Sequence, residues 1–66
     1  MPKFEILNSK DRKVYFRFKA ANGQVLATSE TYESKQACNK GIRSLIEGIR
    51  QSNKVVIQDL TDEHEG

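Results

Sequence analysis

The chain has 66 residues, 36% hydrophobic and 30% charged, and a formal net charge of +2. A chain of this length forms one small domain that buries only about 60% of the surface exposed when unfolded, so its own core is marginal. No stretch approaches the roughly 20 apolar residues of a membrane span, and the N-terminus lacks the apolar run of a secretory signal. We therefore expect no membrane association.

The chain contains one cysteine, Cys38, and one histidine, His64. A single cysteine excludes an internal disulfide, and a zinc site built from Cys and His would need ligands from a second chain. Domains of this size usually gain stability from disulfides, a metal or a partner subunit. Self-association is therefore the expected support, and the free cysteine favours a reducing, cytoplasmic location.

The charges are unevenly distributed. Residues 1–58 carry all eleven basic side chains and five acidic ones, a net charge of +6, whereas residues 59–66 carry four acidic side chains. This pattern is typical of a solvated surface followed by an acidic, flexible tail over residues 61–66. A basic body that attracts polyanions is the alternative, although the tail would partly screen it.

Two strands are predicted at the N-terminus. Residues 3–7 alternate, with Phe4 and Ile6 on one face, and a polar turn follows over residues 8–12. The clearest strand covers residues 13–20. One face of this strand carries Val14, Phe16 and Phe18, and the other carries Tyr15, Arg17 and Lys19.

Asn22-Gly23 predicts a tight hairpin, because both residues tolerate the positive φ angles of a type I′ turn. A two-residue loop would give the pairs Ala21–Gln24, Phe18–Ala27, Arg17–Thr28, Phe16–Ser29 and Tyr15–Glu30. A longer loop would shift the register and turn Leu26 inward. The sequence leaves this choice open.

A helix is predicted after Ser34, whose hydroxyl can cap the first turn, and it continues to about Gln51. Its apolar stripe comprises Ala37, Cys38, Ile42, Leu45, Ile46 and Ile49. Its opposite face comprises Lys35, Asn39, Lys40, Arg43, Glu47 and Arg50. Gly41 lies beside the stripe, which indicates either a close approach of helix and sheet or a gap that faces a substrate.

Residues 54–58 are rich in β-branched side chains and predict a fourth strand. The three consecutive apolar residues Val55, Val56 and Ile57 suggest a strand that is covered on both faces or lies at the centre of a sheet. Such burial is unusual for the last strand of a small one-sided sheet. It therefore indicates cover from a second chain.

An ordered set of residues in the chain resembles one known family. The set is Phe4-Glu5-Ile6, Tyr15 to Ala20, Asn22 to Val25, Ser29-Glu30, Tyr32, Ser34-Lys35, Ala37-Cys38, Gly41-Ile42 and Ser44. These residues are similar to the YegP-like family of short prokaryotic proteins of unknown function. The resemblance covers about residues 3–60.

The resemblance implies a β-β-β-α-β unit of the α+β class, with an antiparallel sheet and one helix on one face, over residues 1–60. In that family the units occur either as tandem repeats in one chain or as two subunits, and they join into one sheet and exchange their C-terminal strands. For this single unit, the resemblance implies a homodimer in which residues 54–58, including Val55, Val56 and Ile57, cross to the partner. It implies no catalytic residue and no cofactor.

Candidate catalytic residues are few. Cys38 lies near the helix N-terminus, where a thiol can be activated, but it falls on the apolar stripe and no histidine is placed to act as its base. His64 lies among acidic residues of the tail, where no fixed ligand geometry is expected. Glu30 and Glu33 bracket the loop before the helix, with nothing to desolvate them. No nucleotide-binding or nucleophile motif is present, so we expect neither an enzyme nor a metal site.

The open face of the predicted sheet offers one functional option. Tyr15, Arg17 and Lys19 form a stripe of one aromatic and two cations, which suits base stacking with phosphate pairing. The alternative is an ordinary solvated face with cross-strand pairs. The sequence therefore favours a small non-enzymatic homodimeric binding module, with weak, sequence-tolerant nucleic-acid binding as the second hypothesis.

Overall fold

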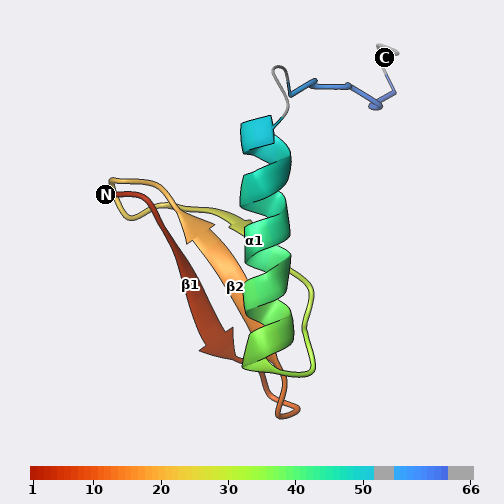
Figure 1. Ribbon diagram of the computed structural model, residues 1–66. Coiled ribbons are helices and arrows are strands. Elements are labelled where there is room, and N and C mark those ends of the chain that lie inside the picture. Colours follow the sequence, from red (N-terminus) through yellow and green to blue (C-terminus); the bar gives the residue numbers. More distant parts are fainter. Residues whose placement is uncertain (52–54, 63–66) are drawn as a thin grey trace.

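The computed structural model of the chain describes residues 1–51 and 55–62 (Figure 1). It contains the strands β1 (Lys3–Asn8), β2 (Val14–Lys19) and β3 (Val25–Thr28), and the helix α1 (Lys35–Gln51). The strands form an antiparallel sheet of order β1-β2-β3, and α1 packs on one face against β1 and β2. The predicted α+β architecture, three strands followed by a helix, is therefore confirmed.

The alternation predicted for the first two strands is present. Phe4 pairs with Phe18 and Ile6 with Phe16 across the β1–β2 ladder. Because neighbouring residues of a strand point to opposite faces, the aromatic residues line the helix side of the sheet. The ring of Phe4 lies 5.6 Å from that of Phe16 and 4.9 Å from that of Phe18, measured between centroids.

The β2–β3 hairpin differs from the two-residue turn of the sequence-based expectation. The amide of Ala20 donates to the carbonyl of Gln24, so the predicted Ala21–Gln24 pair is wrong. Gly23 adopts a φ of +90°, and the Asn22 side chain accepts a hydrogen bond from the Gln24 amide. The loop is therefore one residue longer, and Gly23 provides the left-handed conformation that this turn needs.

A bulge in β3 restores the predicted register further along the hairpin. The ladder is irregular between Phe18 and Lys19, and Leu26 is the extra residue opposite this step. The predicted pairs Phe18–Ala27 and Arg17–Thr28 are therefore confirmed despite the longer loop. Leu26 is exposed rather than turned inward.

Beyond β3 the chain follows β2 less regularly. Ser29 pairs with Phe16 as predicted, through its amide in one direction and its hydroxyl in the other. Tyr32 then forms an isolated bridge with Val14. From Ser29 to Tyr32 the chain advances three residues while β2 advances two, so the expected Tyr15–Glu30 ladder pair does not form.

The predicted helix and its cap are confirmed. The Ser34 hydroxyl accepts a hydrogen bond from the Ala37 amide at 3.1 Å, which satisfies one of the unpaired amides of the first turn. Cys38 and Ile42 are buried together with Val14 and Phe16, and Phe4 and Tyr32 pack against this core.

The C-terminal half of the predicted apolar stripe is not buried. Leu45 is 44% exposed, Ile46 38% and Ile49 54%. The helix has 17 residues and is therefore about 26 Å long, and Figure 1 shows the strands leaning away from its C-terminal half. The single sheet covers only the first half of the helix.

Gly41 allows a close approach, as expected, and its neighbour is the ring of Tyr32. A Cβ atom at position 41 would lie 2.8 Å from Cζ of Tyr32 and still closer to the hydroxyl. Real Cβ atoms essentially never approach other atoms this closely. The alternative of a gap that faces a substrate is therefore wrong.

We expect Gly41→Ala to lower the melting temperature, because the Tyr32 ring must move out of its packed position. The control is Gly48→Ala, since a Cβ there meets nothing within 4 Å. That change should raise stability by up to about 1 kcal/mol, the helix preference of alanine over glycine. Thermal unfolding of both variants is the measurement, and an equal gain in both would contradict the close packing at Gly41.

The predicted fourth strand does not form within the single chain. Residues 55–58 belong to no strand or helix, and residue 54 lies outside the described residues. Val55 is 64% exposed, Val56 78% and Ile57 94%. Of the predicted tail, residues 61 and 62 belong to no helix or strand, and residues 63–66, including His64, lie outside the described part of the chain.

Candidate functional site

The face of the sheet opposite α1 carries the three residues singled out in the sequence. Tyr15, Arg17 and Lys19 alternate along β2 with the residues of the aromatic face. The β1 ladder adds Leu7 opposite Tyr15 and Lys3 opposite Lys19. The structure therefore brings one tyrosine and three cations together on this face.

Glu5 lies at the centre of these cations. Its carboxylate is 2.7 Å from Nε of Arg17, 3.5 Å from Nζ of Lys19 and 3.4 Å from Nζ of Lys3. The hydrogen bond from Arg17 lowers the pKa of Glu5 below its ordinary value of 4.5, and the nearby positive charges reinforce this against partial desolvation. The cluster has a net charge of +2, and Arg17 is already engaged.

Sequence reasoning missed Glu5 and Lys3 as members of this face. The signal was available, since the alternation that places Phe4 and Ile6 inward places Lys3 and Glu5 outward. An antiparallel β1–β2 hairpin then sets Glu5 opposite Arg17. This geometry agrees with the interpretation of a solvated face stabilised by cross-strand pairs. The side chain of Arg17, however, pairs with Glu5 on β1.

We expect Glu5→Gln to make the free energy of unfolding less dependent on pH in the acidic range. A carboxylate whose pKa is lowered by folding stabilises the protein above its ordinary pKa of 4.5, and the contribution is lost as pH falls through the folded value. The variant should be less stable at pH 7 and should lose less stability below pH 4.5. Chemical denaturation across this range is the measurement.

The control is Glu33→Gln. Glu33 lies 3.4 Å from Lys13 in a single ion pair, and its side chain is highly exposed. Exposed pairs of this kind contribute little, so this change should affect stability less. An identical pH profile for wild type and Glu5→Gln would contradict the central role of Glu5.

Cys38 is a core residue. It is fully buried, and desolvation raises the pKa of its thiol. A nucleophilic cysteine requires an accessible thiolate, so the interpretation as a small buried hydrophobe is confirmed. Among the described residues, no group of three or more His, Cys, Asp or Glu side chains is placed to hold a metal ion.

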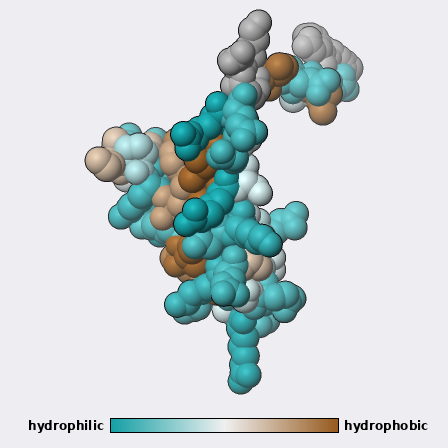
Figure 2. Space-filling view, viewed as in Figure 1, coloured by the Kyte–Doolittle hydropathy of each residue, from teal (hydrophilic) through white to brown (hydrophobic). Residues whose placement is uncertain are grey.

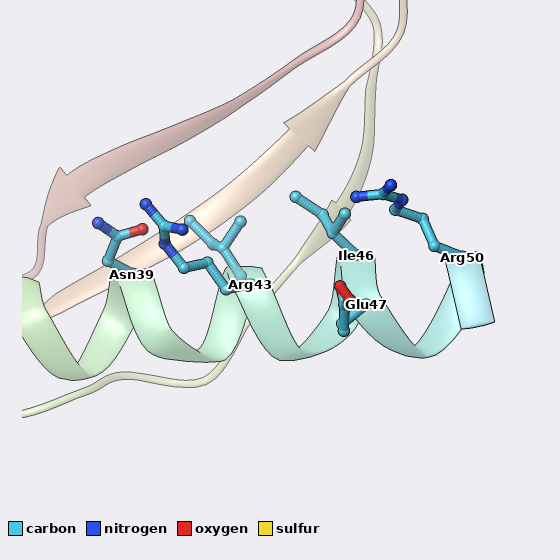
Figure 3. Close-up of a pocket in the computed structure, with 6 residues that line it drawn as sticks. Asn39, Arg43, Ile46, Glu47 and Arg50 are labelled. Atoms are coloured by element: carbon cyan, nitrogen blue, oxygen red, sulfur yellow. The ribbon is translucent and has the colours of Figure 1, made fainter.

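A second concave surface lies on α1. It is a groove of about 290 Å³ lined by Asn39, Ile42, Arg43, Ile46, Glu47 and Arg50. Figure 3 shows Asn39, Arg43, Ile46 and Arg50 projecting from one side of the helix, which is the side on which the strands lie. The sequence predicts four of these residues, Asn39, Arg43, Glu47 and Arg50, on the face of the helix opposite to the apolar stripe.

The helix of the described segment, residues 35–51, is too short and too polar to cross a bilayer, and no other helix is present in the part of the chain that the structure describes.

Comparison with known proteins gives consistent matches. Residues 9–49 match the family model described as a domain of unknown function, DUF1508. A UPF0339 protein of Methanosarcina acetivorans is 38% identical over 58 residues, which cover 88% of this chain and the whole of that protein. One from Treponema denticola is 54% identical over 43 residues, 65% of this chain and 74% of that protein.

Other relatives are longer. The UPF0339 protein YegP of Escherichia coli is 45% identical over 42 residues, which cover 64% of this chain but only 38% of YegP. The chain thus spans less than half of this relative. The resemblance to YegP-like proteins seen in the sequence is confirmed, and the chain belongs to the DUF1508 family, whose function is unknown.

Proposed function

We propose that the protein is a small non-enzymatic interaction module that acts as a homodimer, in which residues 54–58 cross to the partner subunit. The observation that carries this proposal is the exposure of Val55, Val56 and Ile57, which are 64–94% exposed in the single chain. Three successive β-branched residues in a strand are typical of burial on both faces. A second chain would bury these side chains.

The small core of the chain supports the proposal. Among the described residues, four hydrophobic side chains form the buried core, which is small for an independent domain. A core of this size is marginal without further support such as a partner subunit.

The lengths of the relatives are consistent with an assembly of two units. A relative from Methanosarcina acetivorans is covered completely by 58 residues of this chain. In a relative from Acinetobacter baylyi, 59 matched residues are 50% of the protein. The remaining half of that relative has the length of a second unit, which two copies of this chain would supply separately.

Light scattering combined with size-exclusion chromatography tests the proposal. We expect twice the mass of one chain at micromolar concentration and a melting temperature that rises with concentration, because dimerisation stabilises by mass action. A monomer that remains folded at high dilution would overturn the strand-exchanged dimer.

The open sheet face is the basis of a second candidate function, weak binding of single-stranded nucleic acid. The observation that favours it is the presence of three cations and Tyr15 on one face. Phosphates would have to compete with Glu5 for Arg17 and Lys19, which argues for low affinity. A dimer would present the face twice.

Fluorescence anisotropy with a labelled oligonucleotide tests this second candidate. Affinity should fall steeply with salt and decrease in Arg17→Ala and Lys19→Ala. Lys10→Ala is the control, since Lys10 is an exposed cation in the β1–β2 turn. No change in anisotropy at low salt, or an equal loss in all three variants, would count against the sheet face.

A further inference from the structure

The two sides of the sheet differ in the kind of ligand that they can take. On the helix side, Figure 2 shows hydrophobic surface between the strands and α1, flanked by hydrophilic side chains. Ile6 of β1 and Ile46 of α1, which are 40% and 38% exposed, belong to this side. The other side of the sheet carries charged residues of β1 and β2, and α1 packs on the face opposite to them (Figure 1). The open face is therefore the side that suits a polar ligand.

Four charged side chains of the open face form two cross-strand pairs. Lys3 lies directly opposite Lys19, and Glu5 lies directly opposite Arg17. The Arg17 Nε contacts Oε1 of Glu5 at 2.7 Å, and the two lysine Nζ atoms lie 3.4 and 3.5 Å from Oε2. Three cations thus converge on one carboxylate, which balances only one of them. Because like charges directly opposite each other are unfavourable, the cluster has an excess of positive charge around a single anionic group.

A phosphate group suits the position that the carboxylate occupies. Arginine binds phosphate through parallel N–H bonds, and lysine binds it as a point charge. The side chains of Glu5, Arg17 and Lys19 keep 23–32% of their surface exposed, and that of Lys3 keeps 60%. Ion pairs that water can reach are weak. A phosphate that arrives from solvent can therefore displace the Glu5 carboxylate.

Tyr15 places an aromatic surface next to this cluster. It precedes Arg17 by two residues on the same face of β2, a separation of about 7 Å along a strand. Leu7 lies opposite Tyr15 on β1, so one end of the face is apolar and the other is cationic. A base stacked on the Tyr15 ring would have its phosphate beside the cluster.

We propose that Glu5 occupies the phosphate site of the open face in the free protein and is displaced when single-stranded nucleic acid binds. Arg17, Lys19 and Lys3 then hold the phosphate, and the released carboxylate turns to solvent. Glu5 thereby sets the affinity of the face and selects for anions that can outcompete a carboxylate. This inference rests on the second candidate function and identifies the residue that regulates it.

Glu5→Gln tests the assignment, because glutamine has the same shape as glutamate but no charge. The probe is a fluorescently labelled oligothymidylate in an anisotropy titration. The variant should bind about tenfold more tightly than wild type at low salt, and its salt dependence should be steeper by about 0.7 in log–log slope, the value for one more phosphate contact to a single strand. Far-UV circular dichroism at the working temperature verifies that the variant is folded.

Two further variants separate the release of Arg17 from a general change of charge. Glu47→Gln makes the same change of net charge on α1, where the Glu47 carboxylate accepts a hydrogen bond from Gln51, and it should leave the affinity nearly unchanged. The double variant Glu5→Gln with Arg17→Ala should lose most of the gain, because the released guanidinium is then absent.

A measurement on the wild-type protein needs no substitution. In the free protein the Nε–H of Arg17 donates to the Glu5 carboxylate. Displacement breaks this hydrogen bond. The NMR signals of the Arg17 Nε–H group and of the Glu5 carboxylate carbon should therefore both shift when the oligothymidylate binds.

The outcomes separate this inference from the function on which it rests. Three results would overturn the role of Glu5 and leave nucleic-acid binding intact: no tighter binding in Glu5→Gln, a gain that Glu47→Gln reproduces or the double variant retains, and unchanged Glu5 and Arg17 signals in the bound wild type. No binding by either wild type or Glu5→Gln at low salt overturns both. Binding by Glu5→Gln alone supports Glu5 as the occupant of the site and overturns the second candidate function for the wild type.

Discussion

Replacing Phe16 with alanine is expected to unfold a large fraction of the protein at 25 °C. Among the described residues, Phe16 is one of four buried hydrophobic side chains, and its ring contacts those of Phe4 and Tyr32, with centroids 5.6 and 6.1 Å away. Truncating a buried Phe to Ala costs about 3–5 kcal/mol. A domain of this length has a stability of about 3–10 kcal/mol, so the loss is comparable to the whole.

Circular dichroism and urea titration measure this effect. Leu26→Ala is the matched control, since Leu26 is the exposed residue of the β3 bulge, and exposed positions usually change stability by less than about 0.5 kcal/mol. The titration should be repeated at several protein concentrations, because dimerisation adds stability by mass action. A cost below about 1 kcal/mol for Phe16→Ala would mean that the buried cluster is not the core.

The elements that sequence predicted well are those set by local chemistry. The alternation of residues 13–20 determined which side chains line the helix face, and the Ser34 cap determined where α1 begins. Both depend on residues that are neighbours in the chain. Periodicity and capping express such short-range constraints directly.

The hairpin could be predicted only in part. Asn22-Gly23 marks the turn, but a type I′ turn and a three-residue loop with a bulge both use glycine at positive φ. The structure has the longer loop, and the extra residue Leu26 in β3 restores the pairing of Phe18 with Ala27. This choice depends on how β3 lies against β2, which the turn sequence does not specify.

The residues of the open face could be predicted in full only with knowledge of how separate strands pair. Tyr15, Arg17 and Lys19 were identified from one strand, but Glu5 joins them only because β1 pairs with β2 in the observed register. The helix stripe was overpredicted for a related reason. Periodicity shows which residues share a side of α1, but the extent of the sheet decides which of them are covered, and Leu45 and Ile49 lie beyond it.

Replacing Val55, Val56 and Ile57 together with serine is expected to convert the dimer into a monomer. In the single chain these side chains are already 64–94% exposed, so the change would cost a monomeric protein almost nothing. In the exchanged dimer each side chain is buried, and burial of a Val or Ile contributes about 1.5–3 kcal/mol. Since 1.4 kcal/mol is tenfold in affinity, we expect the dissociation constant to rise by more than about 100-fold.

Sedimentation equilibrium and thermal unfolding over a range of concentrations measure the result. The variant should have the mass of one chain and, without the contribution of the partner subunit, should be largely unfolded, as should a chain that lacks residues 54–58. Leu26→Ser is the control, because it also replaces an exposed apolar residue but lies outside the segment. If the triple variant kept both the mass and the melting temperature of wild type, these three side chains would not be buried in an interface, and the exposed segment would have no part in assembly.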